Sequence, residues 1–180
     1  MKTLFATAVL ASLCIATSAL AQQPPKPLID SYGAPFPTTG AVERPDPKLR
    51  YRVVFSVTKA AADPSKPTPS LDKIARFLNL LDADGVRIKP GDVVAIIYGP
   101  ATAVVATDAG YAAKTKAMTN PTLPLIAKLQ AAGVVMAVCG QALSAHQIPS
   151  SDLAPGIRVD VAAMTTLANL QLRGWAVLTD

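Results

Sequence analysis

The stretch VVMAVCGQAL, residues 134–143, carries a run of buried-type residues directly into a helical pattern. Residues 134–138 predict a short strand, and residues 140–146 predict the helix that follows it. Cys139 lies at this junction, where Gly140 gives the backbone the freedom to turn. The junction is therefore typical of a βα unit.

The same alternation of short apolar strands and helical stretches runs along the chain from about residue 50. RYRVVFSVT (50–58) and DVVAIIY (92–98) are apolar at their centres, as strands buried on both faces are. Further strands are predicted at 157–160 and 175–178. Helices are predicted from an N-cap at Ser70 to Gly85, from Gly99-Pro100 to about Lys114, from 120 to 133, and over 162–172. Successive βαβ units give parallel strands covered on both faces. We therefore predict an α/β fold, a three-layer α/β/α sandwich with a five-stranded parallel sheet.

The first residues, MKTLFATAVLASLCIATSALA (1–21), have the layout of a cleaved secretory signal peptide. Lys2 precedes an apolar run that ends in small residues, and cleavage is expected after Ala21. The run is too short for a comfortable membrane span, so we expect a soluble chain in the periplasm or outside the cell. A lipoprotein built on Cys14 is the weaker alternative, because Leu13 precedes that cysteine where a small residue is expected. Cleavage removes Cys14 and leaves Cys139 as the lone thiol, so no intrachain disulfide can form.

Residues 22–48 form a proline-rich segment with no helical or alternating apolar period. The pattern predicts an extended arm or linker. Ile29, Tyr32 and Phe36 could anchor it to its own domain or to a neighbouring subunit, and disorder is the alternative. The α/β domain is then expected over residues 49–180.

Composition and motifs exclude several classes of function. The formal net charge of +5 falls to +4 without Lys2, and the basic residues are scattered, which gives nucleic-acid binding little support. One histidine and one mature-chain cysteine cannot form a usual zinc site. The turn TKAAAD (58–63) lacks the glycines of a phosphate cradle, so no cofactor or metal is predicted.

The candidate site lies at the carboxyl ends of the strands, where open parallel sheets gather functional groups. Lys59, Tyr98 and Cys139 each end or follow a predicted strand there, with Gly99 and Gly140 beside them. A thiolate at the start of a helix is stabilised by unpaired N–H groups and the helix dipole. The plain alternative is a buried structural cysteine. His146 follows Cys139 by seven residues, about 10 Å along a helix, which is too far for a catalytic dyad.

Four stretches resemble, in order, the DsrE/DsrF-like family, especially its small exported members. They are RVVFSVT, DVVAIIYGPA, VVMAVCGQAL and MTTLANLQLRGWAVL, and the resemblance runs from about Tyr51 to the end of the chain. It implies a compact sheet with the third strand beside the second and fourth, and assembly into trimers or hexamers. Family members in sulfur relays carry a persulfide on a cysteine just after strand three, the position of Cys139. The resemblance makes Tyr98, Gly99, Gly140 and Gln141 candidates for lining the pocket.

Two departures limit what the resemblance implies. The relay proteins work in the cytoplasm, whereas this chain carries an export signal, and an oxidising compartment makes a persulfide vulnerable. Some members also lack known catalysis. Three functions follow as hypotheses: a sulfur carrier or sulfurtransferase-like protein that uses Cys139 with a sulfane-sulfur donor and acceptor, a non-catalytic oligomeric binding or scaffold module, and a redox sensor that forms disulfides between chains. The redox sensor ranks last because Cys139 has no resolving partner.

Overall fold

The computed structural model describes residues 26–180, and its five strands form one parallel sheet in the order β4-β3-β2-β1-β5. The predicted signal peptide (1–21) and residues 22–25 lie outside the described residues. The elements are β1 (Val53–Val57), α1 (Pro69–Ala83), β2 (Val93–Ile97), the 3-10 helix η1 (Gly99–Val105), α2 (Asp108–Ala112), α3 (Leu123–Ala131), β3 (Val135–Cys139), α4 (Gly140–His146), the 3-10 helix η2 (Ser150–Asp152), β4 (Arg158–Asp160), α5 (Ala163–Leu172) and β5 (Ala176–Thr179).

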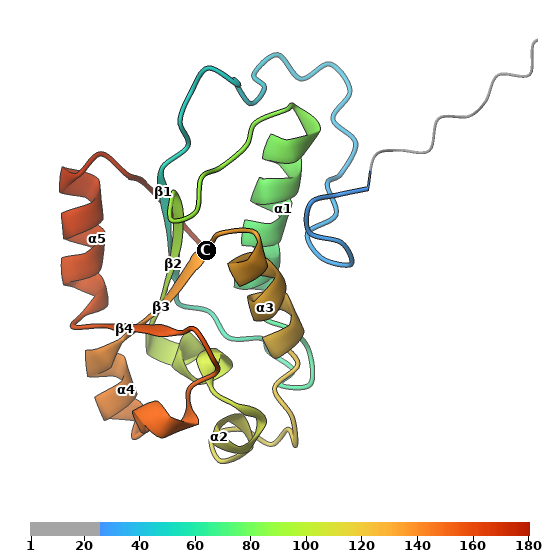
Figure 1. Ribbon diagram of the computed structural model, residues 1–180. Helices are drawn as coiled ribbons and strands as arrows, with labels where there is room; N and C mark the ends of the chain where they lie inside the picture. The colour runs from blue at the N-terminus through green and yellow to red at the C-terminus, as the bar shows by residue number, and fades with distance from the viewer. Residues whose placement is uncertain (1–25) are drawn as a thin grey trace, which may run out of the picture.

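Helices cover both faces of the sheet, so the predicted three-layer α/β/α sandwich is confirmed. Helices α1 and α3 lie on one side and α5 on the other (Figure 1). Strand β3 pairs with β2 and β4, as the family resemblance implies. No helix within residues 26–180 combines the length and the apolar character that a membrane crossing requires.

The two faces of the sheet carry separate hydrophobic clusters because alternate strand residues point to opposite sides. The larger cluster joins Phe55 and its neighbours to α1 and α3. The smaller one lies under α5, where Val54, Ile96 and Ala137 pack with Leu170. Cys139 belongs to the smaller cluster, and its side chain therefore faces α5.

Two sequence-based boundaries are wrong because of contacts with residues far away in the chain. The helix predicted from Gly99-Pro100 to Lys114 is broken into η1 and α2, since Ala106 forms an isolated bridge with Leu153 and Thr107 caps α2. Helix α1 begins after Thr68 with proline at its first position, which suits the fixed φ of proline. The predicted cap, Ser70, instead donates its hydroxyl to the Asp180 carboxylate.

The described part of the proline-rich arm packs against α1. Ile29 is buried, and its backbone exchanges two hydrogen bonds with the side chain of Asn79. Gly33 has a positive φ of 60° and lies so close to the α1 backbone that a Cβ atom would stand 2.1 Å from the Arg76 nitrogen. Phe36 is exposed, although Arg76 lies 4.9 Å from its ring centre. The arm therefore contacts the face opposite the one that Cys139 occupies.

Candidate functional site

Cys139 is the last residue of β3, and α4 begins at the next residue. Its residue surface is 6% exposed, and it packs with Ala137, Ala162 and Leu170. Gly140 lets the chain pass close to β4, because a Cβ atom on it would lie 3.1 Å from the Asp160 carbonyl oxygen. The thiol is thus held at the carboxyl edge of the sheet, just below the surface.

The strand register places a titratable side chain on each side of Cys139. Cys139 pairs directly with Asp160 of β4, and residues opposite each other in a sheet point to the same face. The pair Ile97 and Val138 precedes it, so Tyr98 stands opposite Cys139 at the next position toward β2. With strands about 4.8 Å apart, Tyr98, Cys139 and Asp160 form one row across three strand ends.

Asp160 is the centre of a polar network beside the thiol. Its carboxylate accepts bonds from Arg158 Nε and Nη2 at 2.7 and 2.9 Å, and from Thr166 Oγ1 at 2.8 Å. Arg158 and Asp160 are two residues apart in β4, which puts both side chains on the α5 face. Sequence reasoning missed this network; the only signal was the spacing of two residues between opposite charges in a predicted strand.

Tyr98 and Gly99 lie where the sequence placed them, at the end of β2. The Tyr98 hydroxyl lies 2.8 Å from Ser56 Oγ of β1, so its ring packs in the cluster that contains Cys139 while its hydroxyl is bonded toward the neighbouring strand. Gly99 has a φ of 57°, which favours glycine, and begins η1. Gln141 is exposed on the first turn of α4.

Lys59 is not brought together with Cys139. Its backbone N–H donates to the Asp180 carboxylate, and its ammonium group donates to the Asp180 main-chain oxygen. Both distances are 2.8 Å, and Asp180 lies just after β5. Strand β2 lies between β1 and β3, so Lys59 and Cys139 end strands that are not neighbours, and Lys59 lies toward β5. Burial raises the pKa of Asp180, but bonds from Ser70, Lys59 and Thr58 outweigh it and lower the pKa to about 2. Lys59 and Asp180 thus join β1 to β5.

His146 and the loop over residues 59–70 belong to a separate cavity. This cavity of 300 Å³ is lined by His146, Tyr111 and residues of the loop, and the Tyr111 hydroxyl donates to the Pro64 carbonyl at 3.1 Å. The loop over residues 59–70 therefore packs on η1 and α2. It contributes no residue to the cluster around Cys139.

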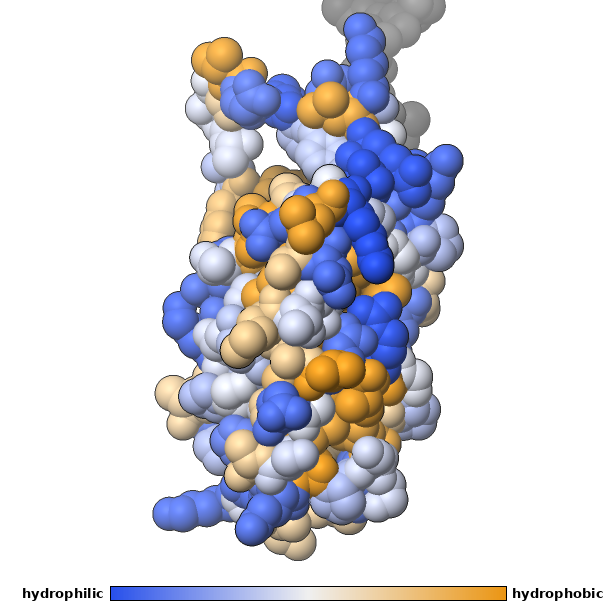
Figure 2. All heavy atoms as spheres, turned by 90° about the vertical axis from the view of Figure 1, so that its left-hand side faces the viewer, coloured by the Kyte–Doolittle hydropathy of each residue, from blue (hydrophilic) through white to orange (hydrophobic). Residues whose placement is uncertain are grey.

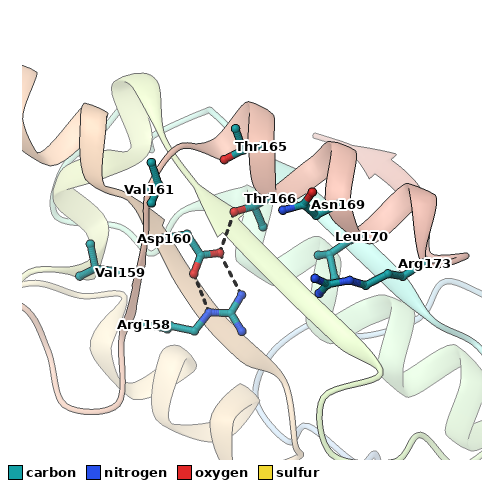
Figure 3. Close-up of a pocket in the computed structure, with 9 residues that line it drawn as sticks. All are labelled: Arg158, Val159, Asp160, Val161, Thr165, Thr166, Asn169, Leu170 and Arg173. Atoms are coloured by element: carbon teal, nitrogen blue, oxygen red, sulfur yellow. Dashed lines mark hydrogen bonds and ion pairs between the residues drawn. The ribbon is translucent and has the colours of Figure 1, made fainter.

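Two cavities flank strand β4 next to the candidate site. One, of 510 Å³, is lined by Gly140, Ser144, Val159 and neighbours from α4 and the following loop. The other, of 410 Å³, lies between β4 and α5 and contains the Asp160 network (Figure 3). Cys139 lines neither of them. Within residues 26–180, no group of three or more histidine, cysteine, aspartate or glutamate side chains could hold a metal ion.

The fold and the strand-end thiol define a class, parallel α/β/α domains with a single cysteine at the carboxyl edge of the third strand. The chain belongs to the DsrE/DsrF-like family, whose pattern matches residues 51–179. Among solved structures it is similar to MTH1491, a protein of unknown function from Methanobacterium thermoautotrophicum. The two share 22% identity over 72% of this chain and 99% of the other, with a TM-score of 0.54, a likeness that shows the fold alone. No curated protein matches this chain.

Proposed function

We propose that this protein is an exported sulfur carrier that holds sulfane sulfur as a persulfide on Cys139. The observation that carries the proposal is the place of Cys139 in a DsrE/DsrF-like chain, at the carboxyl end of the third strand. Cys139 is also the one thiol left after removal of residues 1–21. A lone thiol with no resolving cysteine in its chain suits a carrier that receives and passes one sulfur atom.

The proposed step is a nucleophilic transfer without net oxidation. The Cys139 thiolate attacks the outer sulfur of a donor, such as thiosulfate or a polysulfide. A new bond forms between Sγ and the outer sulfur, while the donor's sulfur–sulfur bond breaks. Its electron pair leaves with the donor fragment, which is sulfite in the case of thiosulfate. A second nucleophile then takes the outer sulfur and restores the thiolate.

Access to the thiol depends on the chain that covers it. Cys139 packs under Ala162 and Ala163, at the first turn of α5, and both are small residues. Small side chains bury little surface, so a local opening of this turn costs less than opening a large apolar contact. We therefore place the route of the donor at the start of α5.

Intact-mass analysis tests the proposal. The mature protein is incubated with thiosulfate or polysulfide, and we expect a mass gain of one sulfur atom that dithiothreitol removes. Cys139→Ala is the matched control and should gain nothing. An unmodified wild-type protein whose Cys139 is readily alkylated by iodoacetamide would count against the carrier. Native spectra of the same samples report removal of residues 1–21 and the trimer or hexamer that we propose as the assembly.

A second candidate, a non-catalytic oligomeric binding or scaffold module, is favoured by two observations. Cys139 is buried in an apolar cluster, as structural cysteines are. Apolar residues also reach the surface around α5, among them Val161 and Met164, and Figure 2 shows apolar side chains between polar ones on this side of the molecule. Such exposed apolar residues suit a subunit contact. Alkylation that is negligible in the native protein and rapid in urea would favour this module.

A further inference from the structure

We infer that the groove between β4 and α5 is a binding site for a small oxyanion, held by Arg158 and Arg173. The groove encloses 410 Å³, and its lining combines polar and charged side chains with the apolar Val159, Val161 and Leu170. In Figure 3 the two guanidinium groups point toward each other, one from β4 and one from the end of α5. The inference stands on these residues and does not depend on sulfur chemistry at Cys139.

Arg158 is held in place by its neighbours. Two of its N–H groups bind the Asp160 carboxylate, which Thr166 Oγ1 also holds. A guanidinium group carries five N–H donors, so three remain for a ligand. Because Asp160 already fixes the Arg158 guanidinium group, binding an anion costs less side-chain entropy than it would for a free arginine.

Arg173 supplies the charge that the groove has in excess. Its backbone N–H ends α5 by binding the Asn169 and Leu170 carbonyls. Its guanidinium group has no carboxylate within 4.0 Å among residues 26–180, whereas Arg158 is paired with Asp160. The charged residues of the lining are two arginines and one aspartate, which leaves one positive charge uncompensated.

The polar groups around this charge define the ligand. Figure 3 shows the Asn169 amide on the same wall as Arg173, one turn earlier in α5, with Thr165 and Thr166 further along the groove. Guanidinium and amide N–H groups donate hydrogen bonds, and they match the oxygens of a sulfate, thiosulfate or carboxylate group. The Thr165 and Thr166 hydroxyls already donate to the Ala162 carbonyl and the Asp160 carboxylate, so they line the groove without serving as donors to the anion. The three apolar residues leave room for an organic part of the ligand. Since Asp160 pairs with Cys139, the oxyanion would lie one strand away from the thiol.

The test measures binding in Cys139→Ala protein, so that no thiol chemistry can contribute. Sulfate and thiosulfate are titrated at constant ionic strength, and amide shifts of Asn169, Leu170 and Arg173 are followed by NMR. We expect saturable shifts confined to the groove. Arg173→Gln should weaken binding about 10- to 100-fold, the range expected for losing charge-assisted hydrogen bonds. Arg173→Lys keeps the charge but lacks the planar guanidinium group, so its affinity should lie between those of the parent protein and Arg173→Gln.

Arg87→Gln is the matched control. It removes the same charge from an exposed arginine that pairs with Asp82 at the end of α1, on the opposite face of the sheet. Shifts without saturation, or equal weakening by Arg173→Gln and Arg87→Gln, would overturn the site in favour of general charge attraction. Failure of the persulfide experiment would leave this result untouched, because the binding assay contains no thiol.

Discussion

Replacing Asn79 with alanine is expected to release the arm from α1 and to destabilise the domain by about 1.5–3 kcal/mol. The Asn79 side chain is 3% exposed and bonds four backbone groups of the arm, at 2.7 to 3.1 Å. If the arm stays in place, its buried groups lose their partners, at about 1–3 kcal/mol each. If it detaches, water satisfies those groups, but Ile29 is exposed at a cost of about 1.5–3 kcal/mol. The protein adopts the less costly of the two states, and this sets the expected range.

Urea unfolding followed by far-ultraviolet circular dichroism measures the loss, and hydrogen exchange of the Ile29 amide reports whether the arm has left. Asn169→Ala is the control, an exposed asparagine in α5 whose side chain makes no hydrogen bond within residues 26–180, and it should change stability by less than about 0.5 kcal/mol. A loss below about 1 kcal/mol in Asn79→Ala, with the Ile29 amide still protected, would refute the reasoning.

Two further predictions concern the strand ends. Asp180 has a pKa of about 2 in the folded chain against 3.8 when unperturbed, so its contribution is present above pH 4 and is lost as the pH falls toward 2. Asp180→Asn should therefore be less stable than wild type by about 1–2 kcal/mol at pH 7, after allowance for solvent screening, and the gap should close in acid; a gap independent of pH contradicts this. Tyr98→Phe leaves the buried Ser56 hydroxyl without its partner at 2.8 Å and should cost about 1 kcal/mol in urea unfolding. The double variant with Ser56→Ala should cost less than the sum of the two single changes, whereas additive losses would show that the bond contributes nothing.

The strands and most helices could be predicted because their signals are local. The apolar run of β2 is rich in β-branched residues and ends before Gly99-Pro100, which favours a strand, and the apolar stripe of α1 keeps helical spacing, which favours a helix. Prediction failed between Gly99 and Lys114, where alanine favours a helix but a bridge from Ala106 to Leu153 breaks it. That partner is more than forty residues away, so no local pattern could indicate it.

Part of the candidate site could likewise be predicted from local sequence patterns, and part of it could not. Cys139, Gly140 and Tyr98 could be found because each ends a recognisable strand or begins the next element. Lys59 also follows a predicted strand, yet it binds Asp180 after β5, on the side of β1 that faces away from β3. The Asp160 network was missed because a three-residue edge strand carries almost no periodic signal.

By itself, the sequence determined that the chain alternates strands with helices and that one thiol stands at the end of the third strand, since hydrophobic period and turn residues act over a few positions. Only the tertiary structure decided what surrounds that thiol. The strand order and register place Asp160 and Tyr98 on either side of Cys139 and bring α5 over it. Register depends on packing between segments far apart in the chain, and for that reason the arginine-lined groove appears only once the sheet is assembled.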